Sequence, residues 1–170
     1  MNKLYKVHFL VGFLYALFIA PCAISASLTL EIQGHENNQG QLHIAISQVK
    51  GSLHDGTLWD DLESVRKIIE NIDTEQALQP NIHLIIEGLP IGFTCIRLYL
   101  DLNNNQLLER SSMGFPLEPV GFSNNPSLFN GEPTPLESCF LLQENANLQK
   151  IELKRHKKRK RKSKLGVVIN

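Results

Sequence analysis

The chain lacks the short motifs that identify the common classes of enzyme. It has no G-x-S-x-G, H-E-x-x-H, G-x-x-x-x-G-K or C-x-x-C sequence, which would mark a nucleophile elbow, a zinc helix, a phosphate loop or a redox pair. Histidine occurs singly beyond the N-terminal segment, and such a residue is usually solvated; these positions are His35, His43, His54, His83 and His156. We therefore expect no enzyme. The alternative is an envelope enzyme acting on a glycan or lipid through Glu109 and Glu118.

Long apolar runs are also scarce. The clearest one, residues 7–19, is shorter than the roughly 20 residues of a membrane-spanning helix. Lys3 and Lys6 precede it, and the small-residue segment Ala23-Ile24-Ser25-Ala26 follows it. This layout predicts a secretory signal peptide over residues 1–26, cleaved after Ala26, and export to the periplasm or the exterior. An uncleaved N-terminal anchor is the alternative.

Positive charge is rare in the body of the chain. Residues 27–153 contain 17 acidic and six basic residues, whereas residues 154–164 contain nine basic residues and no acid. The basic positions of this tail are Lys154, Arg155, Lys157, Lys158, Arg159, Lys160, Arg161, Lys162 and Lys164. We expect residues 154–170 to form a disordered tail. It is either a solvated end or a contact for anionic lipid or lipopolysaccharide. Nucleic acid is disfavoured because no aromatic residues are interleaved for base stacking.

Short strands dominate the remaining pattern. Apolar residues alternate with polar ones at Leu28, Leu30 and Ile32, and this pattern returns within residues 42–46, 82–86, 96–100, 140–142 and 151–153. The segment 34–40 has the composition of a hairpin-type turn. The fold class predicted for residues 27–153 is all-β, an antiparallel β-sandwich of about seven strands.

One segment has the periodicity of a helix. Its apolar residues recur at spacings of three and four, and acidic residues stand near its start, where a helix dipole favours them. These apolar residues are Leu58, Leu62, Val65, Ile69 and Ile72, and the acids are Asp60, Asp61 and Glu63. We predict an accessory amphipathic helix in the crossover between the second and third predicted strands.

Residues 101–125 form the candidate functional segment. Oxygen-bearing side chains recur at every second position, as in the first half of a calcium loop. The candidate calcium ligands are Asp101, Asn103, Asn105, the backbone carbonyl of Leu107, and Glu109. Two positions depart from such a loop, because Gln106 replaces its glycine and Ser112 its bidentate carboxylate. The alternative is a loop whose Asn side chains hydrogen-bond their own backbone.

Three sequence runs resemble a known family. They are Gly88-Leu89-Pro90-Ile91-Gly92, the Asp101-x-Asn103-x-Asn105 segment, and Gly114-Phe115-Pro116-Leu117-Glu118 followed by Gly121-Phe122-Ser123-Asn124-Asn125. They resemble an uncharacterised bacterial family of small exported proteins, catalogued as domain of unknown function 2141. The resemblance covers residues 28–153 and implies an exported β-sandwich with no established activity. Gln106, Leu100 and Pro119 depart from the residues usual in that family, which weakens the transfer of a metal-binding role.

The resemblance also bears on two cysteines. Cys95 and Cys139 stand at positions that the family usually fills with small alanines, which implies that they are neighbours on adjacent strands. Because export exposes them to an oxidising compartment, we favour a disulfide between them. The alternative is a pair of buried free thiols.

The sequence thus predicts an exported, non-catalytic binding or structural module of the bacterial cell envelope. Its working face would be the loops of residues 101–125, where a sandwich commonly places its sites. The predicted ligand-binding residues are Glu118, Gly121, Phe122, Ser123, Asn124 and Asn125. The sequence does not identify the ligand.

Overall fold

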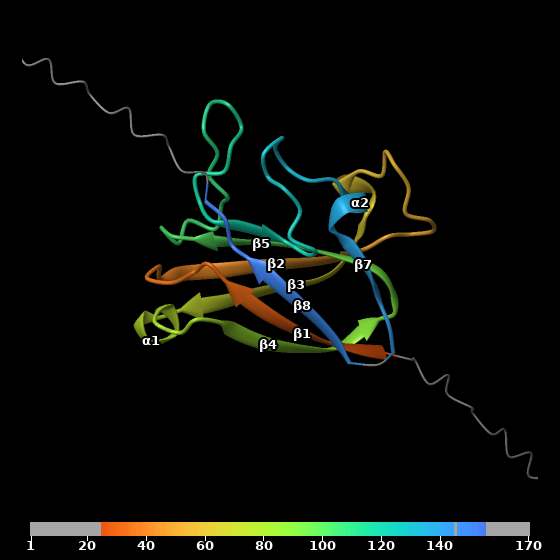
Figure 1. The fold of residues 1–170 in the computed structure, drawn as a ribbon, viewed down its shortest axis with the longest axis horizontal. Coiled ribbons are helices and arrows are strands. Elements are labelled where there is room, and N and C mark those ends of the chain that lie inside the picture. The colour runs from red at the N-terminus through yellow and green to blue at the C-terminus, as the bar shows by residue number, and fades with distance from the viewer. Residues whose placement is uncertain (1–24, 145, 156–170) are drawn as a thin grey trace, which may run out of the picture.

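The computed structural model describes residues 25–144 and 146–155. These residues form eight strands and three short helices (Figure 1). The strands are β1 (Ser25–Gln33), β2 (Gly40–Gln48), β3 (Glu63–Ile72), β4 (Ile82–Pro90), β5 (Gly92–Asp101), β6 (Val120–Phe122), β7 (Cys139–Leu142) and β8 (Asn147–Glu152). The helices are the 3-10 turn η1 (Trp59–Asp61), α1 (Thr74–Ala77) and α2 (Pro135–Ser138). The predicted β-sandwich is confirmed, with eight strands rather than about seven.

The strands form two sheets. The smaller sheet has the order β4-β1-β8, and β8 runs parallel to β1. The larger sheet has the order β3-β2-β5-β6, and β7 also pairs with β5. β6 pairs with residues 97–99 of β5 and β7 with residues 92–95. The two short strands therefore lie one after the other along one edge of β5.

The core lies between the two sheets. Alternation along β1 points Leu28, Leu30 and Ile32 inward, and each is 0% exposed. The facing side chains of β2 and β5 are equally buried, namely Leu42, Ile44, Ile46, Ile96, Leu98 and Leu100. The alternating segments of the sequence lie in strands, apart from Leu153, which follows β8 directly. Burying one face of each strand removes its apolar side chains from water.

The predicted accessory helix over residues 58–72 is wrong. Only Trp59–Asp61 is helical there, and residues 63–72 form β3, which pairs antiparallel with β2 and places Ile68 opposite Ile44. β3 is an edge strand, and its register with β2 shifts between Ile46 and Ser47. Both features disturb a clean alternation, while the β-branched Val and Ile residues favour a strand.

The segment between β1 and β2 is not a hairpin. Its flanking strands belong to different sheets, so the chain crosses the sandwich at this point. Gly34 has a positive φ of 81°, and a Cβ at this position would lie 2.3 Å from the carbonyl oxygen of Leu153. A glycine is required here because the crossing chain lies close to the end of the smaller sheet.

Two predicted segments lie mainly outside the described residues. They are the signal peptide, apart from Ser25 and Ala26, and the basic tail beyond Arg155. Ser25 and Ala26 belong to β1. In the described part of the chain, none of the helices has the length and apolar character needed to cross a bilayer.

Candidate functional site

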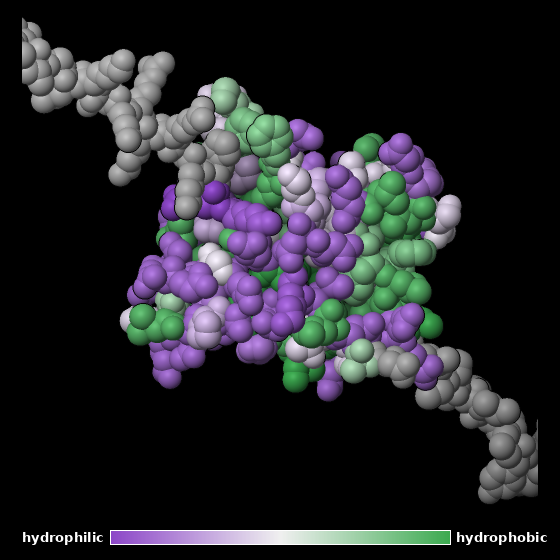
Figure 2. All heavy atoms as spheres, in the orientation of Figure 1, coloured by the Kyte–Doolittle hydropathy of each residue, from purple (hydrophilic) through white to green (hydrophobic). Residues whose placement is uncertain are grey.

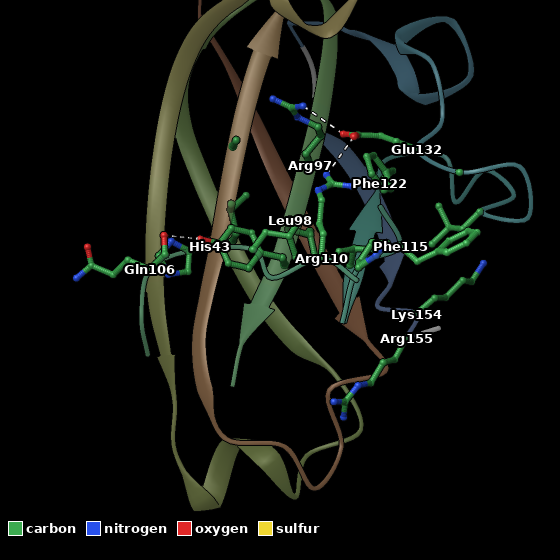
Figure 3. Close-up of a pocket in the computed structure, with 18 of the residues that line it drawn as sticks. His43, Arg97, Leu98, Gln106, Arg110, Phe115, Phe122, Glu132, Lys154 and Arg155 are labelled. Atoms are coloured by element: carbon green, nitrogen blue, oxygen red, sulfur yellow. Dashed lines mark hydrogen bonds and ion pairs between the residues drawn. The ribbon is translucent and has the colours of Figure 1, made fainter. Parts of the chain in front are cut away.

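A pocket of about 760 Å³ opens on the outer face of the larger sheet. Its floor carries outward-facing side chains of β2, β3 and β5, among them His43, Lys67 and Arg97. The loop between β5 and β6, the loop between β6 and α2, and the end of the described chain form its walls (Figure 3). This volume is within the range of small-molecule sites.

The pocket concentrates positive charge. Among the described residues, the basic side chains that line it are Lys67, Arg97, Arg110, Lys154 and Arg155, and the one acidic side chain is Glu132. Residues 27–153 contain only six basic residues, and three of these line the pocket, whereas only one of the 17 acidic residues does. The pocket is thus cationic within an acidic domain, which favours an anionic ligand.

Two arginines share the single carboxylate. Glu132 lies 3.3 Å from Nη1 of Arg97 and 3.2 Å from Nη2 of Arg110 (Figure 3). The guanidinium of Arg97 also lies 4.5 Å from the ring centre of Trp59, a cation–π contact. The indole Nε1 of Trp59 donates to the carbonyl of Pro133, next to Glu132. These contacts position both guanidinium groups at the pocket with planar donors suited to a carboxylate or phosphate.

The remaining lining is largely apolar. Leu108 and Phe115 come from the loop between β5 and β6, Leu128 from the loop between β6 and α2, and Ile69 from β3. Ile69 is 53% exposed, so the pocket offers apolar surface to a ligand as well as charge. Its chemistry suits an amphiphilic molecule with an anionic group.

A histidine and a tyrosine stack on the pocket floor. The rings of His43 and Tyr99 are 4.6 Å apart and inclined by 8°. His43 Nε2 is buried, has no hydrogen-bond partner among the described residues, and lies 3.8 Å from Oδ2 of Asp101. Burial raises the pKa of Tyr99, and the negative charges of Asp101 and Glu118 raise it further. Tyr99 therefore remains a neutral hydrogen-bond donor, and it donates to the carbonyl of Gln106.

Asp101 organises the predicted calcium segment from inside. Its side chain is fully buried and accepts backbone N–H groups of Asn103, Asn105 and Gln106 at 3.2, 3.3 and 2.6 Å. Burial alone would raise the pKa of Asp101, but these donors and that of Asn104 outweigh it and lower the pKa. Gln106 adopts a φ of 64°, so the turn that glycine makes in a calcium loop forms here with glutamine.

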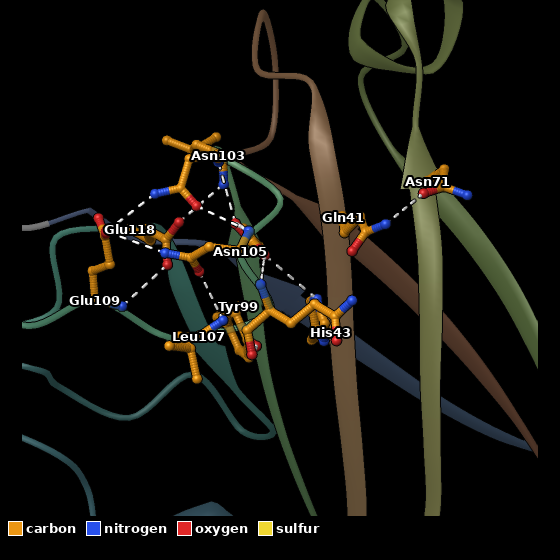
Figure 4. A network of polar contacts seen from close by, with 12 residues as sticks. Gln41, His43, Asn71, Tyr99, Asn103, Asn105, Leu107, Glu109 and Glu118 are labelled. Atoms are coloured by element: carbon orange, nitrogen blue, oxygen red, sulfur yellow. Dashed lines mark hydrogen bonds and ion pairs between the residues drawn. The ribbon is translucent and has the colours of Figure 1, made fainter.

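The other predicted calcium ligands face one another. The side-chain amides of Asn103 and Asn105 donate to one oxygen of Glu109, at 3.1 and 3.2 Å (Figure 4). The Oδ1 atom of Asn105 accepts the backbone N–H of Leu107. Within residues 25–144 and 146–155, no three or more His, Cys, Asp or Glu side chains are grouped to hold a metal ion. These side chains therefore hydrogen-bond within the loop, to Glu109 and to the backbone.

Glu118 is a structural centre of the same loop. It is 3% exposed, and its carboxylate accepts the backbone N–H groups of Leu102 and Glu109. The other carboxylate of the candidate catalytic pair, Glu109, is held by the two Asn amides. Both acids thus have their hydrogen-bonding partners inside the loop.

Polar side chains of the predicted ligand-binding segment 121–125 hydrogen-bond to the backbone of the protein. Ser123 is fully buried, accepts the N–H of Ile96 and donates to the carbonyl of Ser138. Asn124 donates its amide to the carbonyl of Cys139. Gly121 lacks a side chain because a Cβ there would lie 2.8 Å from Cγ2 of Ile151. Phe122 is the member of the segment that lines the pocket.

Cys95 and Cys139 form a disulfide. They stand directly opposite each other in β5 and β7, with their Cα atoms 4.1 Å apart. The structure thus supports the predicted pairing on neighbouring strands.

Sequence reasoning missed most of the pocket. Lys67, Arg97 and Arg110 are far apart in the chain, and nothing in their local sequence links them. Lys154 and Arg155, assigned to the tail, are held at the sandwich, because Lys154 pairs with Val120 and Arg155 Nε donates to the carbonyl of Leu117. The abrupt change from acidic to basic composition at residue 154 was the available signal.

Comparisons with known proteins identify the family of the chain. A protein-family model described as "Uncharacterized protein conserved in bacteria (DUF2141)" matches residues 30–150. Neither a search of curated proteins nor a search of solved structures found a match.

Proposed function

The chain belongs to the uncharacterized bacterial family DUF2141, and from that premise we propose that it is an exported, non-catalytic binding module of the cell envelope. Its binding site is the cationic pocket on the outer face of the larger sheet. Its ligand is a small amphiphile with an anionic group, such as a carboxylate, phosphate or sulfonate. Export rests on the signal-like N-terminal sequence.

The charge distribution is the observation that carries this proposal. Random placement in so acidic a domain would surround a pocket with carboxylates, yet Lys67, Arg97, Arg110, Lys154 and Arg155 line this one with Glu132 alone. Clustered like charges repel one another, so their cost is offset when an anion binds among them. We place the anionic group of the ligand beside Arg97 and Arg110, where it takes the place of the Glu132 carboxylate.

The rest of the pocket defines the remainder of the ligand. Leu108, Phe115, Leu128 and Ile69 provide apolar walls, and contact with them removes apolar ligand surface from water. The proposed site therefore differs from the predicted working face, the loops of residues 101–125. The loop 101–119 supplies only a wall of the pocket, through Leu108, Arg110 and Phe115. The Asp101 network holds that loop in place.

A fluorescent anionic amphiphile tests the proposal. We expect 8-anilinonaphthalene-1-sulfonate to bind the natively folded chain, residues 27–170, and decanoate to displace it. The double substitution Arg97→Gln and Arg110→Gln should weaken the binding of both at least tenfold. The matched control replaces Lys50 and Lys150 by Gln, which removes two cations from surface ion pairs with Glu63 and Glu31.

The result can contradict the proposal in two ways. Equal weakening in both double variants would show that net charge, not the pocket, determines binding. Binding that survives the Arg97 and Arg110 substitutions would place the site elsewhere. Circular dichroism of each variant should first show an unchanged fold.

Calcium binding by the Asp101 loop is a separate proposal about a cofactor. Its support is the alternation of Asp101, Asn103 and Asn105 with Glu109 close by. A cation would have to replace hydrogen bonds that these groups already make. A rise in melting temperature with Ca²⁺ over chelator, removed by Asn103→Ala, would support it, because a ligand of the native state alone stabilises that state.

A further inference from the structure

Large apolar side chains are exposed on the two loops that form walls of the pocket. Leu107, Met113 and Phe129, here called the rim, are 67%, 76% and 89% exposed. Each rim residue is next in sequence to a residue that lines the pocket, namely Leu108, Gly114 and Leu128 respectively. The rim residues thus belong to the two loops that form walls of the pocket. Exposed apolar residues are unremarkable singly, but a group at a pocket mouth indicates a contact surface.

The two loops project on the same side of the sandwich. In Figure 1 the loop that follows β5 and the loop that follows β6 both rise beyond β5, away from the smaller sheet. Figure 2, in the same orientation, shows apolar surface on the projection made by the first of these loops. Met113 lies in the short turn that Arg110 and Pro116 close by a β-bridge. The turn is thus held by backbone pairing while its apolar side chain remains in solvent.

Cations flank the rim. Arg110 is in the loop between β5 and β6. Arg155 is bound to the same loop, since its Nε donates to the carbonyl of Leu117. Lys154 lies next to Arg155 and lines the pocket. The sequence continues from there with seven more Lys and Arg residues between positions 157 and 164. Apolar side chains and cations together match the interface of an anionic bilayer.

We propose that the rim and its flanking cations dock the protein on an anionic phospholipid bilayer, with Met113 and Phe129 inserted at the headgroup boundary and the pocket mouth facing the membrane. The inference goes beyond the proposed function, because docking does not require the pocket to be occupied. It also gives that pocket a source of anionic amphiphiles.

Charge determines both the orientation and the choice of partner. Residues 27–153 carry 17 acids and six basic residues, so an anionic surface repels the rest of the body and attracts the rim side. A second copy docked rim to rim would bring the cations of both chains together, which disfavours it. Nucleic acid fits less well because two of the three rim residues, Leu107 and Met113, have no aromatic face for base stacking, and Phe129 alone offers one.

Vesicle co-sedimentation tests the proposal. We expect the chain of residues 27–170 to bind phosphatidylglycerol vesicles at least tenfold more tightly than phosphatidylcholine vesicles at low salt. The double substitution Met113→Ser and Phe129→Ser should weaken that binding at least fivefold. The matched control, Ile85→Ser and Leu148→Ser, changes two apolar residues of the smaller sheet that are 72% and 54% exposed, and it should leave binding within twofold.

A third variant separates the rim from the tail. It replaces the seven basic residues at 157–164 by Gln and should weaken binding while leaving it sensitive to the rim substitutions. The proposal is overturned if the rim variant binds as tightly as the wild type, or if RNA binds more tightly than the vesicles. Equal loss in the rim variant and its control also overturns it. The pocket test with Arg97→Gln and Arg110→Gln is scored on a soluble ligand, so the two proposals fail independently.

Discussion

The side-chain amide of Asn125 pairs with β8 as a peptide group would. Its Oδ1 accepts the backbone N–H of Glu152, and its Nδ2 donates to the carbonyl of Lys150, both at 2.8 Å. Asn125 follows β6 in the larger sheet, whereas Glu152 belongs to the smaller one. The pair therefore joins the two sheets. The end of a sequence run that resembled a binding loop is part of what holds the sandwich together.

Replacing Asn125 by Asp should destabilise the protein by about 1–3 kcal/mol. The carboxylate has no N–H to donate to the carbonyl of Lys150. A carboxylate oxygen would therefore face that carbonyl oxygen, and the hydrogen bond would be lost. Urea unfolding measures the change. Asn37→Asp is the matched control, because Asn37 has a similar φ of 62° and its side chain makes no hydrogen bond to any residue that the structure describes. Equal loss in both variants would show that backbone strain, not the pairing, matters.

The Asp101 loop should make stability depend on pH. The folded pKa of Asp101 lies below its ordinary value of about 3.9, so the unfolded chain takes up the proton first as the pH falls. The stabilisation is therefore complete above about pH 5 and is lost as the pH falls through 4 toward the folded pKa. Asp101→Asn should cost about 2–4 kcal/mol at pH 7. It should also flatten the stability profile between pH 5 and 2.

Urea unfolding at a series of pH values gives this profile. The control is Asp55→Asn, at an exposed residue of the connection between β2 and β3. If Asp101→Asn loses stability at low pH as the wild type does, the Asp101 carboxylate does not anchor the loop.

The disulfide should contribute to stability by restricting the unfolded chain. It joins residues 44 positions apart, for which loop-closure entropy predicts about 3–4 kcal/mol. The variant Cys95→Ala/Cys139→Ala should therefore melt on the order of 10 °C lower, as measured by calorimetry. Reducing agent should lower the melting temperature of the wild type but not that of the double variant. An equal decrease in both would show that the reducing agent does not act through this disulfide.

Export predicts a defined N-terminus. Protein recovered from the envelope fraction should begin at Ser27, as read by mass spectrometry, because the signal peptide is removed after Ala26. Cleavage there removes Ser25 and Ala26 from the end of β1, which pair with Pro90 and Leu89, and leaves the pairs from Leu28 onward. A mature chain that retains Lys3 and Lys6 would contradict the prediction and support the anchor.

Alternation in the sequence predicts the fold class and most of the strands. The alternation at Leu28–Ile32, Leu42–Ile46 and Ile96–Leu100 is a local property, since one buried face of a strand requires apolar residues at every second position. β3 was misread because its edge position and register shift made Val65, Ile69 and Ile72 fit helical spacing. Those features depend on which strand pairs with it, and that information is not local.

The site depends on contacts between segments far apart in the chain. Lys67, Arg97 and Arg110 come together because β2, β3 and β5 pair side by side and the loop after β5 folds over their outer face. Asp101, Ser123 and Asn125 have polar side chains that suit a ligand as well as they suit a buried backbone N–H or carbonyl. Their sequence shows what they can bond, whereas the fold determines which partner each one reaches. The physical reason is that long-range strand pairing, not local chemistry, sets which side chains share a surface.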